Sequence, residues 1–183
     1  MFDGAALFNA DISQWSTSRV ERMDYMFSGA ESFDIDIGQW DLGKVTNTEW
    51  MFYKAEAFDQ HLSDWDGAFT CVSLLVHARM QWLLTLLAAC FPVLSSPPPV
   101  SRVALMGGMF YKASSFNGEV ASWAVSRVTD FGFMFAEASS FNRPLSDWQL
   151  GPACEMSWMF YAATSLNQNL NAWDGKRPAR TFS

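Results

Sequence analysis

The apolar positions of this 183-residue chain recur with a period of 25 residues. Each copy opens with a Met-Phe pair. Alanine stands four residues after the methionine, Phe or Leu seven after, Asn or Asp eight after, an aliphatic residue eleven after, and tryptophan fourteen after. The pairs begin at Met1, Met26, Met51, Met109, Met134 and Met159, and the tryptophans are Trp15, Trp40, Trp65, Trp123, Trp148 and Trp173. Six copies of one pattern indicate a repeat protein.

Two local patterns within the copies predict secondary structure. Residues 18–30 place apolar side chains at three- and four-residue steps, which predicts one short helix per copy with Ser18 as its N-cap. Residues 8–13 alternate apolar and polar side chains, which predicts a short strand with one buried face. The predicted fold is therefore an α/β repeat, a leucine-rich-repeat-like solenoid with one short strand and one short helix per 25-residue coil.

One copy is too small to fold alone. Its seven or so apolar side chains contribute about 10–20 kcal/mol on burial, whereas ordering its backbone costs about 1–2 kcal/mol per residue. Copies laid side by side bury each other's faces, so only the array is stable.

The recurring polar and aromatic columns have structural interpretations. The Asn or Asp is expected to cap backbone groups of a turn, and the tryptophan is expected to pack in the core or a turn instead of serving as a sugar platform. Three Trp-Asp dipeptides suggest a propeller, but the 25-residue period is too short for one.

Composition narrows the function classes. Half of the residues are hydrophobic, which excludes a disordered chain, and a net charge of −7 argues against nucleic-acid binding. Three cysteines, Cys71, Cys90 and Cys154, form neither a disulfide framework nor a zinc motif. The chain shows no secretory signal, but because Met1 is in phase with the repeats we expect the sequence to begin inside a longer array.

The third copy is interrupted by 33 residues beyond one period, between Trp65 and Met109. We divide the chain into repeat coils at 1–66, an apolar and proline-rich insertion at 67–100, further coils at 101–174 and an irregular tail at 175–183. The insertion has three interpretations: a membrane helix, which is disfavoured because its apolar part is too short; an inserted helix and loop; or translated non-coding sequence, which we favour.

Catalytic chemistry has little support in the sequence. The two histidines, His61 and His77, stand in no recognisable motif, and we expect no enzyme activity and no cofactor. The remaining candidate is an outward column two residues after the Asn or Asp, in which Asp11, Asp36, His61 and Glu119 are candidate binding residues. Its carboxylates could attract Ca²⁺ or a basic protein patch, although stacked like charges also repel.

The repeated pattern "MFxxAxxFNxDISxW…SxVxxMxxMF" resembles the BspA-like leucine-rich-repeat surface proteins, whose repeat is of the DUF285 type. The resemblance covers residues 1–66 and 101–174. It implies a leucine-rich-repeat-like fold, a surface or secreted location, and adhesion or protein binding without catalytic residues.

Two functions follow as expectations. The first is a non-enzymatic module that binds a protein or cell-surface ligand through an extended face. The second is a structural spacer within a longer array, with no ligand of its own.

Overall fold

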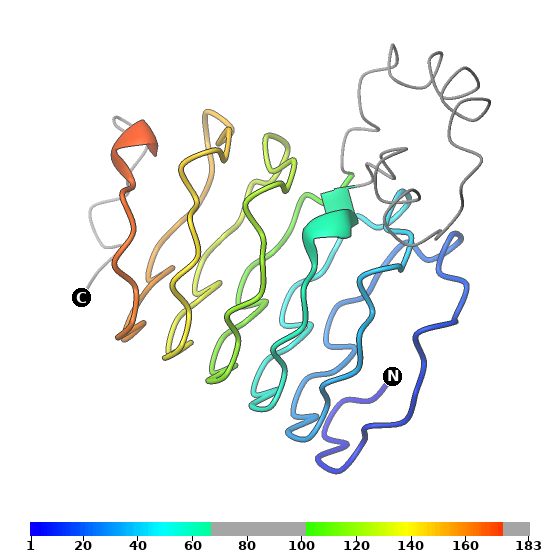
Figure 1. Ribbon diagram of the computed structural model, residues 1–183. Coiled ribbons are helices and arrows are strands. Elements are labelled where there is room, and N and C mark those ends of the chain that lie inside the picture. Colours follow the sequence, from blue (N-terminus) through cyan, green and yellow to red (C-terminus); the bar gives the residue numbers. More distant parts are fainter. Residues whose placement is uncertain (67–101, 174–183) are drawn as a thin grey trace, which may run out of the picture.

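The computed structural model describes residues 1–66 and 102–173. Within them the six repeat copies form coils that lie side by side along one axis in chain order (Figure 1). Each coil packs against its neighbours in the sequence, so equivalent residues of successive copies line up in columns. The predicted insertion (67–100) and the predicted tail (175–183) lie outside the described residues.

The prediction of one strand and one helix per coil is wrong. The described residues contain no α-helix and no β-strand. Their only helices are two short 3₁₀ helices, η1 (Ser63–Asp66) and η2 (Asn171–Trp173). Neighbouring coils are instead joined by isolated parallel β-bridges, which link Arg22 to Asn47, Asn47 to Leu105, Leu105 to Asp130 and Asp130 to Glu155. The coils are built from turns and irregular extended segments.

Left-handed backbone conformations replace the predicted helix. Within 18–30, Tyr25 has a φ of 54° and Gly29 a φ of 68°, values that a right-handed helix does not contain. The same two columns are left-handed along the stack, at Trp50, Lys54, Gly108, Lys112, Phe133, Glu137, Trp158 and Ala162. Consecutive turns ending in such residues direct apolar side chains inward every three or four positions, which is the spacing that sequence alone attributes to a helix.

The backbone of this turn segment divides its N–H groups between two kinds of acceptor. The N–H groups of Met23, Tyr25 and Phe27 donate to the carbonyls of Asn47, Glu49 and Met51 in the next coil. The intervening N–H groups donate three residues back within the same coil, as from Met26 to Met23. A helix would satisfy these groups internally, whereas here half of them hold the coils together.

The predicted strand at 8–13 is replaced by an extended segment held by side chains. The Asn9 Oδ1 atom accepts a hydrogen bond from the Asp34 N–H at 3.0 Å, and Asp34 does the same for the Asp59 N–H. The column continues in this way through Asn117, Asn142 and Asn167. The Asn/Asp side chains therefore accept hydrogen bonds from backbone N–H groups, but these groups belong to the extended segment of the next coil and not to a turn, where the prediction placed them.

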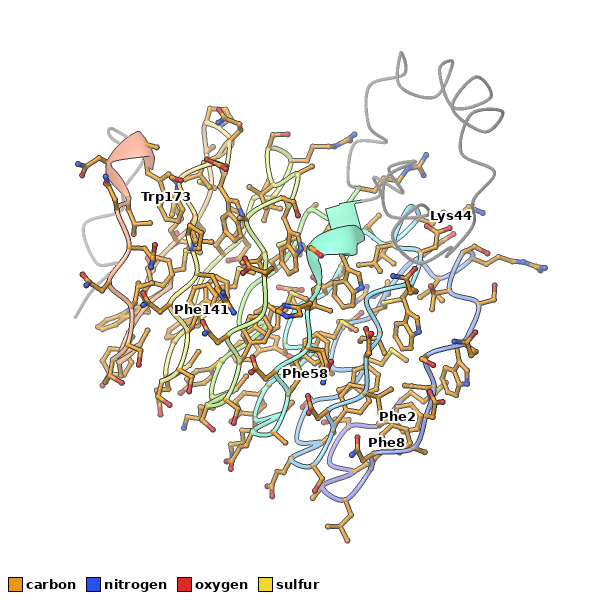
Figure 2. The ribbon with its side chains drawn as sticks, in the orientation of Figure 1. Phe2, Phe8, Lys44, Phe58, Phe141 and Trp173 are labelled. Carbon is orange, nitrogen blue, oxygen red and sulfur yellow. The ribbon has the colours of Figure 1, made fainter. Side chains whose placement is uncertain are left out.

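The core consists of aromatic columns that run the length of the stack. Phe27 and Phe52 stack with ring centroids 5.7 Å apart, and Phe110 and Phe135 lie 5.5 Å apart. Figure 2 shows the labelled Phe58 and Phe141 within the stack, and both are fully buried. The alanine column is equally buried beyond the first coil and before the last, and it belongs to the same core cluster as the phenylalanines.

The tryptophan column is confirmed as core packing. From Trp40 to Trp173 the indoles are 1–6% exposed, and each Nε1–H donates to the carbonyl of the aliphatic residue in the preceding coil. Trp148, for example, donates to Val120 at 2.9 Å. A buried indole needs such an acceptor, so the column fixes the register between coils.

The stack continues across the interrupted third copy. Asn47 of the second coil bridges to Leu105, and the Thr48 N–H donates to the Leu105 carbonyl at 3.0 Å. Trp65, before the interruption, stacks on Trp123 with centroids 6.2 Å apart. Residues on both sides of the insertion therefore belong to one coil, which pairs with the coils before and after it as the other coils do.

Candidate interaction surface

The predicted acidic column is placed at the turns, where its members interact locally. Asp11 Oδ1 accepts a hydrogen bond from the Ser13 N–H at 3.0 Å, and Asp36 Oδ1 accepts one from the Gly38 N–H at 2.9 Å. Interactions with the Ser13 side chain and backbone hold the pKa of Asp11 below its usual value. These carboxylates act as turn caps within their own coils.

The other two candidates of that column behave differently. His61 is exposed, and Glu119 accepts a 2.7 Å hydrogen bond from Arg143 Nη1 of the next coil. Across the described ranges, no three His, Cys, Asp or Glu side chains come together in a way that could hold a metal ion. Ligand binding by Asp11, Asp36, His61 and Glu119 remains a prediction.

A continuous row of aromatic side chains lies on the surface formed by the turn segments. It belongs to two columns, the residue before each Met-Phe pair and the residue after it. We call this row the aromatic ribbon; its members are Tyr25, Trp50, Tyr53, Tyr111, Phe133, Trp158 and Tyr161. The four members that precede a Met-Phe pair, Tyr25, Trp50, Phe133 and Trp158, have positive φ angles. The phenylalanine side chains of the following pairs are buried in the core.

The ribbon is partly exposed over its whole length. Tyr25 is 45% exposed, Phe133 38% and Tyr161 40%, whereas the other four members are half-buried. Each ring contacts the next: Tyr25 stacks on Trp50, Tyr53 on Tyr111, and Phe133 on Trp158, with centroids 5.4–6.5 Å apart. Rings stacked in this way form a continuous apolar row from coil to coil.

The centre of the ribbon departs from the repeat. At Gly108 the column lacks a side chain, and a Cβ atom there would lie 2.5 Å from the Trp50 ring. The Trp50 indole thus occupies the space above Gly108. There it makes edge-to-face contacts with Tyr53 and Tyr111, with ring centroids 5.6 and 5.9 Å apart. Only glycine combines this close approach with the φ of 61° observed there.

Two lysines border this central cluster. Lys54 Nζ lies 5.4 Å from the Tyr53 centroid, and Lys112 Nζ lies 5.1 Å from the Tyr111 centroid. Glu137 accepts a hydrogen bond from the Tyr111 hydroxyl at 3.0 Å and pairs with Lys112 at 3.6 Å. Burial and then the Glu137 hydrogen bond raise the pKa of Tyr111, so its hydroxyl remains protonated as a donor.

Sequence reasoning missed the ribbon because it followed only the columns that repeat in every copy. The signal was available: the residue before Met-Phe is aromatic in four copies, and tyrosine follows Met-Phe in three. Whether such residues face the core or solvent depends on their backbone conformation. The helical expectation gave no reason to place both columns side by side on one exposed face.

Comparisons with known proteins identify the family. A family described as "Mycoplasma protein of unknown function, DUF285" matches residues 1–72 and 95–182. Comparison with curated proteins finds no match, and comparison with solved structures finds none either. Among the described residues no helix is long and apolar enough to cross a membrane. The matched residues include all six repeat copies, and the chain belongs to the DUF285 family.

Proposed function

We propose that this chain is a non-enzymatic repeat module that binds another protein through the aromatic ribbon. The observation that carries the proposal is the continuity of the ribbon, in which seven partly exposed aromatic side chains contact one another across successive coils. Soluble surfaces rarely collect so much contiguous apolar area without an interaction partner.

The chemistry of the ribbon suits a protein partner. Tyrosine and tryptophan are enriched among the residues that dominate protein–protein binding energy, since they bury large areas and lose few rotamers on binding. The ladder of backbone hydrogen bonds between coils holds the rings in fixed positions before any partner arrives. Such preorganisation lowers the entropic cost of association.

The resemblance to BspA-like leucine-rich-repeat surface proteins supports the same function. It suggests adhesion or protein binding at a cell surface. We propose the cell surface as the location of this module on that basis.

The test compares the wild-type protein with a ribbon variant, Tyr25→Asn/Phe133→Asn/Tyr161→Ser. Asparagine is chosen at the two left-handed positions because it tolerates that conformation. Partners captured from an extracellular extract are identified by mass spectrometry, and binding of each purified partner is then measured by biolayer interferometry. We expect the ribbon variant to lose about tenfold or more in affinity.

The control is Leu7→Ser, which removes an apolar side chain that is 89% exposed and lies outside the ribbon. Both variants are to retain the wild-type melting temperature within a few degrees. A partner that binds wild type and ribbon variant equally contradicts the proposal. Absence of any specific partner would favour the spacer function.

A further inference from the structure

A second surface column carries positive charge. In four consecutive coils a basic residue stands three positions before the residue that forms the β-bridge. We call this row the basic ridge; its members are Arg19, Lys44, Arg102 and Arg127. All four side chains are exposed. Lys44 lies at an edge of the stack, away from the labelled Phe2, Phe8 and Phe58 (Figure 2).

The ridge is not neutralised by the part of the protein that the structure describes. The ion pairs there use Arg22, Lys112 and Arg143, and none uses a ridge residue. The nearby Asp41 carboxylate instead accepts a 2.8 Å hydrogen bond from the Gly43 N–H, as a turn cap. The residues just before the ridge positions in the described coils are small: Ser18, Gly43 and Ser126.

The spacing of the ridge follows from the stack. Neighbouring coils are joined by parallel β-bridges, which set equivalent backbone positions about 4.7–4.9 Å apart. Four like charges in such a row repel one another and weaken the free protein slightly. An anionic chain laid along the ridge would remove that repulsion.

We propose that the basic ridge binds a linear acidic polysaccharide, with the sugar chain parallel to the stack axis. The separation of coils is comparable to the length of one pyranose residue, so the four ridge residues span a few consecutive sugars and can pair with the sulfate or carboxylate groups on the side of the sugar chain that faces the protein. A more highly charged polymer such as duplex DNA, with one charge per about 1.7 Å of axis, fits poorly on a protein of net charge −7. The basic ridge and the aromatic ribbon have no residue in common.

The experiment uses the full chain and immobilised heparin as a strongly sulfated probe, with surface plasmon resonance at two salt concentrations. The ridge variant is Arg19→Gln/Lys44→Gln/Arg102→Gln/Arg127→Gln. We expect it to lose about tenfold or more in affinity at low salt and to show a shallower dependence on salt, because fewer counterions are released.

The matched control is Arg22→Gln/Lys54→Gln/Lys112→Gln/Arg143→Gln, which removes the same amount of positive charge from other places. We expect it to bind heparin within about threefold of wild type, since its charges lie outside the ridge. Circular dichroism melting of both variants verifies that they are folded. The ribbon variant described above is expected to bind heparin normally, which separates this proposal from the proposed protein-binding function.

Three results would overturn the inference. Wild-type protein with no salt-sensitive heparin binding excludes the site. Equal losses in the ridge variant and its control show that overall charge, and not the ridge, attracts the polymer. Stronger binding to duplex DNA or to anionic phospholipid vesicles than to heparin assigns the ridge to a different class of partner.

Discussion

At the scale of single residues, left-handed positions carry strain that glycine would relieve. Ala162 has a φ of 54° and is exposed, so it bears the cost of about 1–2 kcal/mol that an L-residue has in this conformation. We expect Ala162→Gly to be neutral or to stabilise the protein by up to about 1 kcal/mol, because this relief outweighs the greater entropy of the unfolded chain. Urea denaturation measures the change.

The control for this prediction is Ala10→Gly at an exposed position that is not left-handed. It is expected to cost about 0.5–1 kcal/mol, as glycine does where its freedom is not needed. Equal losses at Ala10 and Ala162 would show that the left-handed residue carries no strain.

The Asn/Asp column gives a second prediction at this scale. Asn142 Oδ1 accepts hydrogen bonds from the Asn167 N–H and from Gln168 Nε2, at 2.8 and 2.9 Å. We expect Asn142→Ala to reduce the free energy of unfolding by about 0.5–1.5 kcal/mol. Asn142→Asp retains the acceptor oxygen and is expected to restore most of the loss in the same urea titration; a deficit as large as that of alanine would refute the capping role.

At the scale of the element, the turn segment shows why periodicity alone was ambiguous. Apolar side chains at Val20, Met23, Phe27 and Ala30 follow a helical spacing, and the last three are buried as that spacing predicts. The backbone that places them there is a series of turns with Tyr25 and Gly29 in the left-handed region. A three- to four-residue spacing specifies which side chains face inward, but both conformations satisfy it.

The tryptophan column joins neighbouring elements and supports a prediction. Trp148 is 2% exposed and donates to the Val120 carbonyl at 2.9 Å. Trp148→Phe leaves that buried carbonyl without its donor, and we expect a loss of about 1–3 kcal/mol, with a further cost from the smaller ring. Differential scanning calorimetry measures the stability.

Trp15 provides the comparison within the same column. It lies in the first coil and is 42% exposed, so Trp15→Phe removes less buried contact. We expect this variant to cost clearly less than Trp148→Phe. Comparable losses would mean that the indole hydrogen bond between coils contributes little.

At the scale of the whole molecule, the continuous stack predicts that the insertion is dispensable. Deleting residues 67–99 joins Asp66 to Val100 and restores the order Trp-Asp-aliphatic found at 40–42. A small apolar hollow lies at this junction and is lined by Leu42, Trp65, Val103 and Trp123. After the deletion, Val100 takes the repeat position that Leu42 has in the preceding coil. We expect the shortened protein to fold and to gain up to about 3 kcal/mol, because closing a long loop costs entropy.

Thermal unfolding monitored by circular dichroism, alongside the full chain, measures the effect of this deletion. A deletion variant that is unfolded or melts well below the full chain would show that residues 67–99 contribute to the stack. Ridge and ribbon binding are expected to survive the deletion, since their residues lie at 19–54 and 102–161.

The sequence by itself determined the repeat, the columns that form the core, and the interruption of the third copy. It did so because burial follows the spacing of apolar residues, and Phe27, Trp40 and Ala55 are buried where their columns predict. The burial of the tryptophan column was also predicted correctly. The Asn/Asp column was predicted only in part, because its side chains cap the extended segment of the next coil and not a turn of their own.

Only the tertiary structure decided the backbone of each coil and the faces it presents. Hydrogen bonds from one coil to the next, as from Phe27 to Met51, replace those of a helix, and they exist only once the copies are stacked. Left-handed residues such as Tyr25 and Phe133 then place aromatic side chains in one exposed row. Hydrogen bonds between residues 24 or 57 positions apart set these conformations, and local sequence patterns do not contain them.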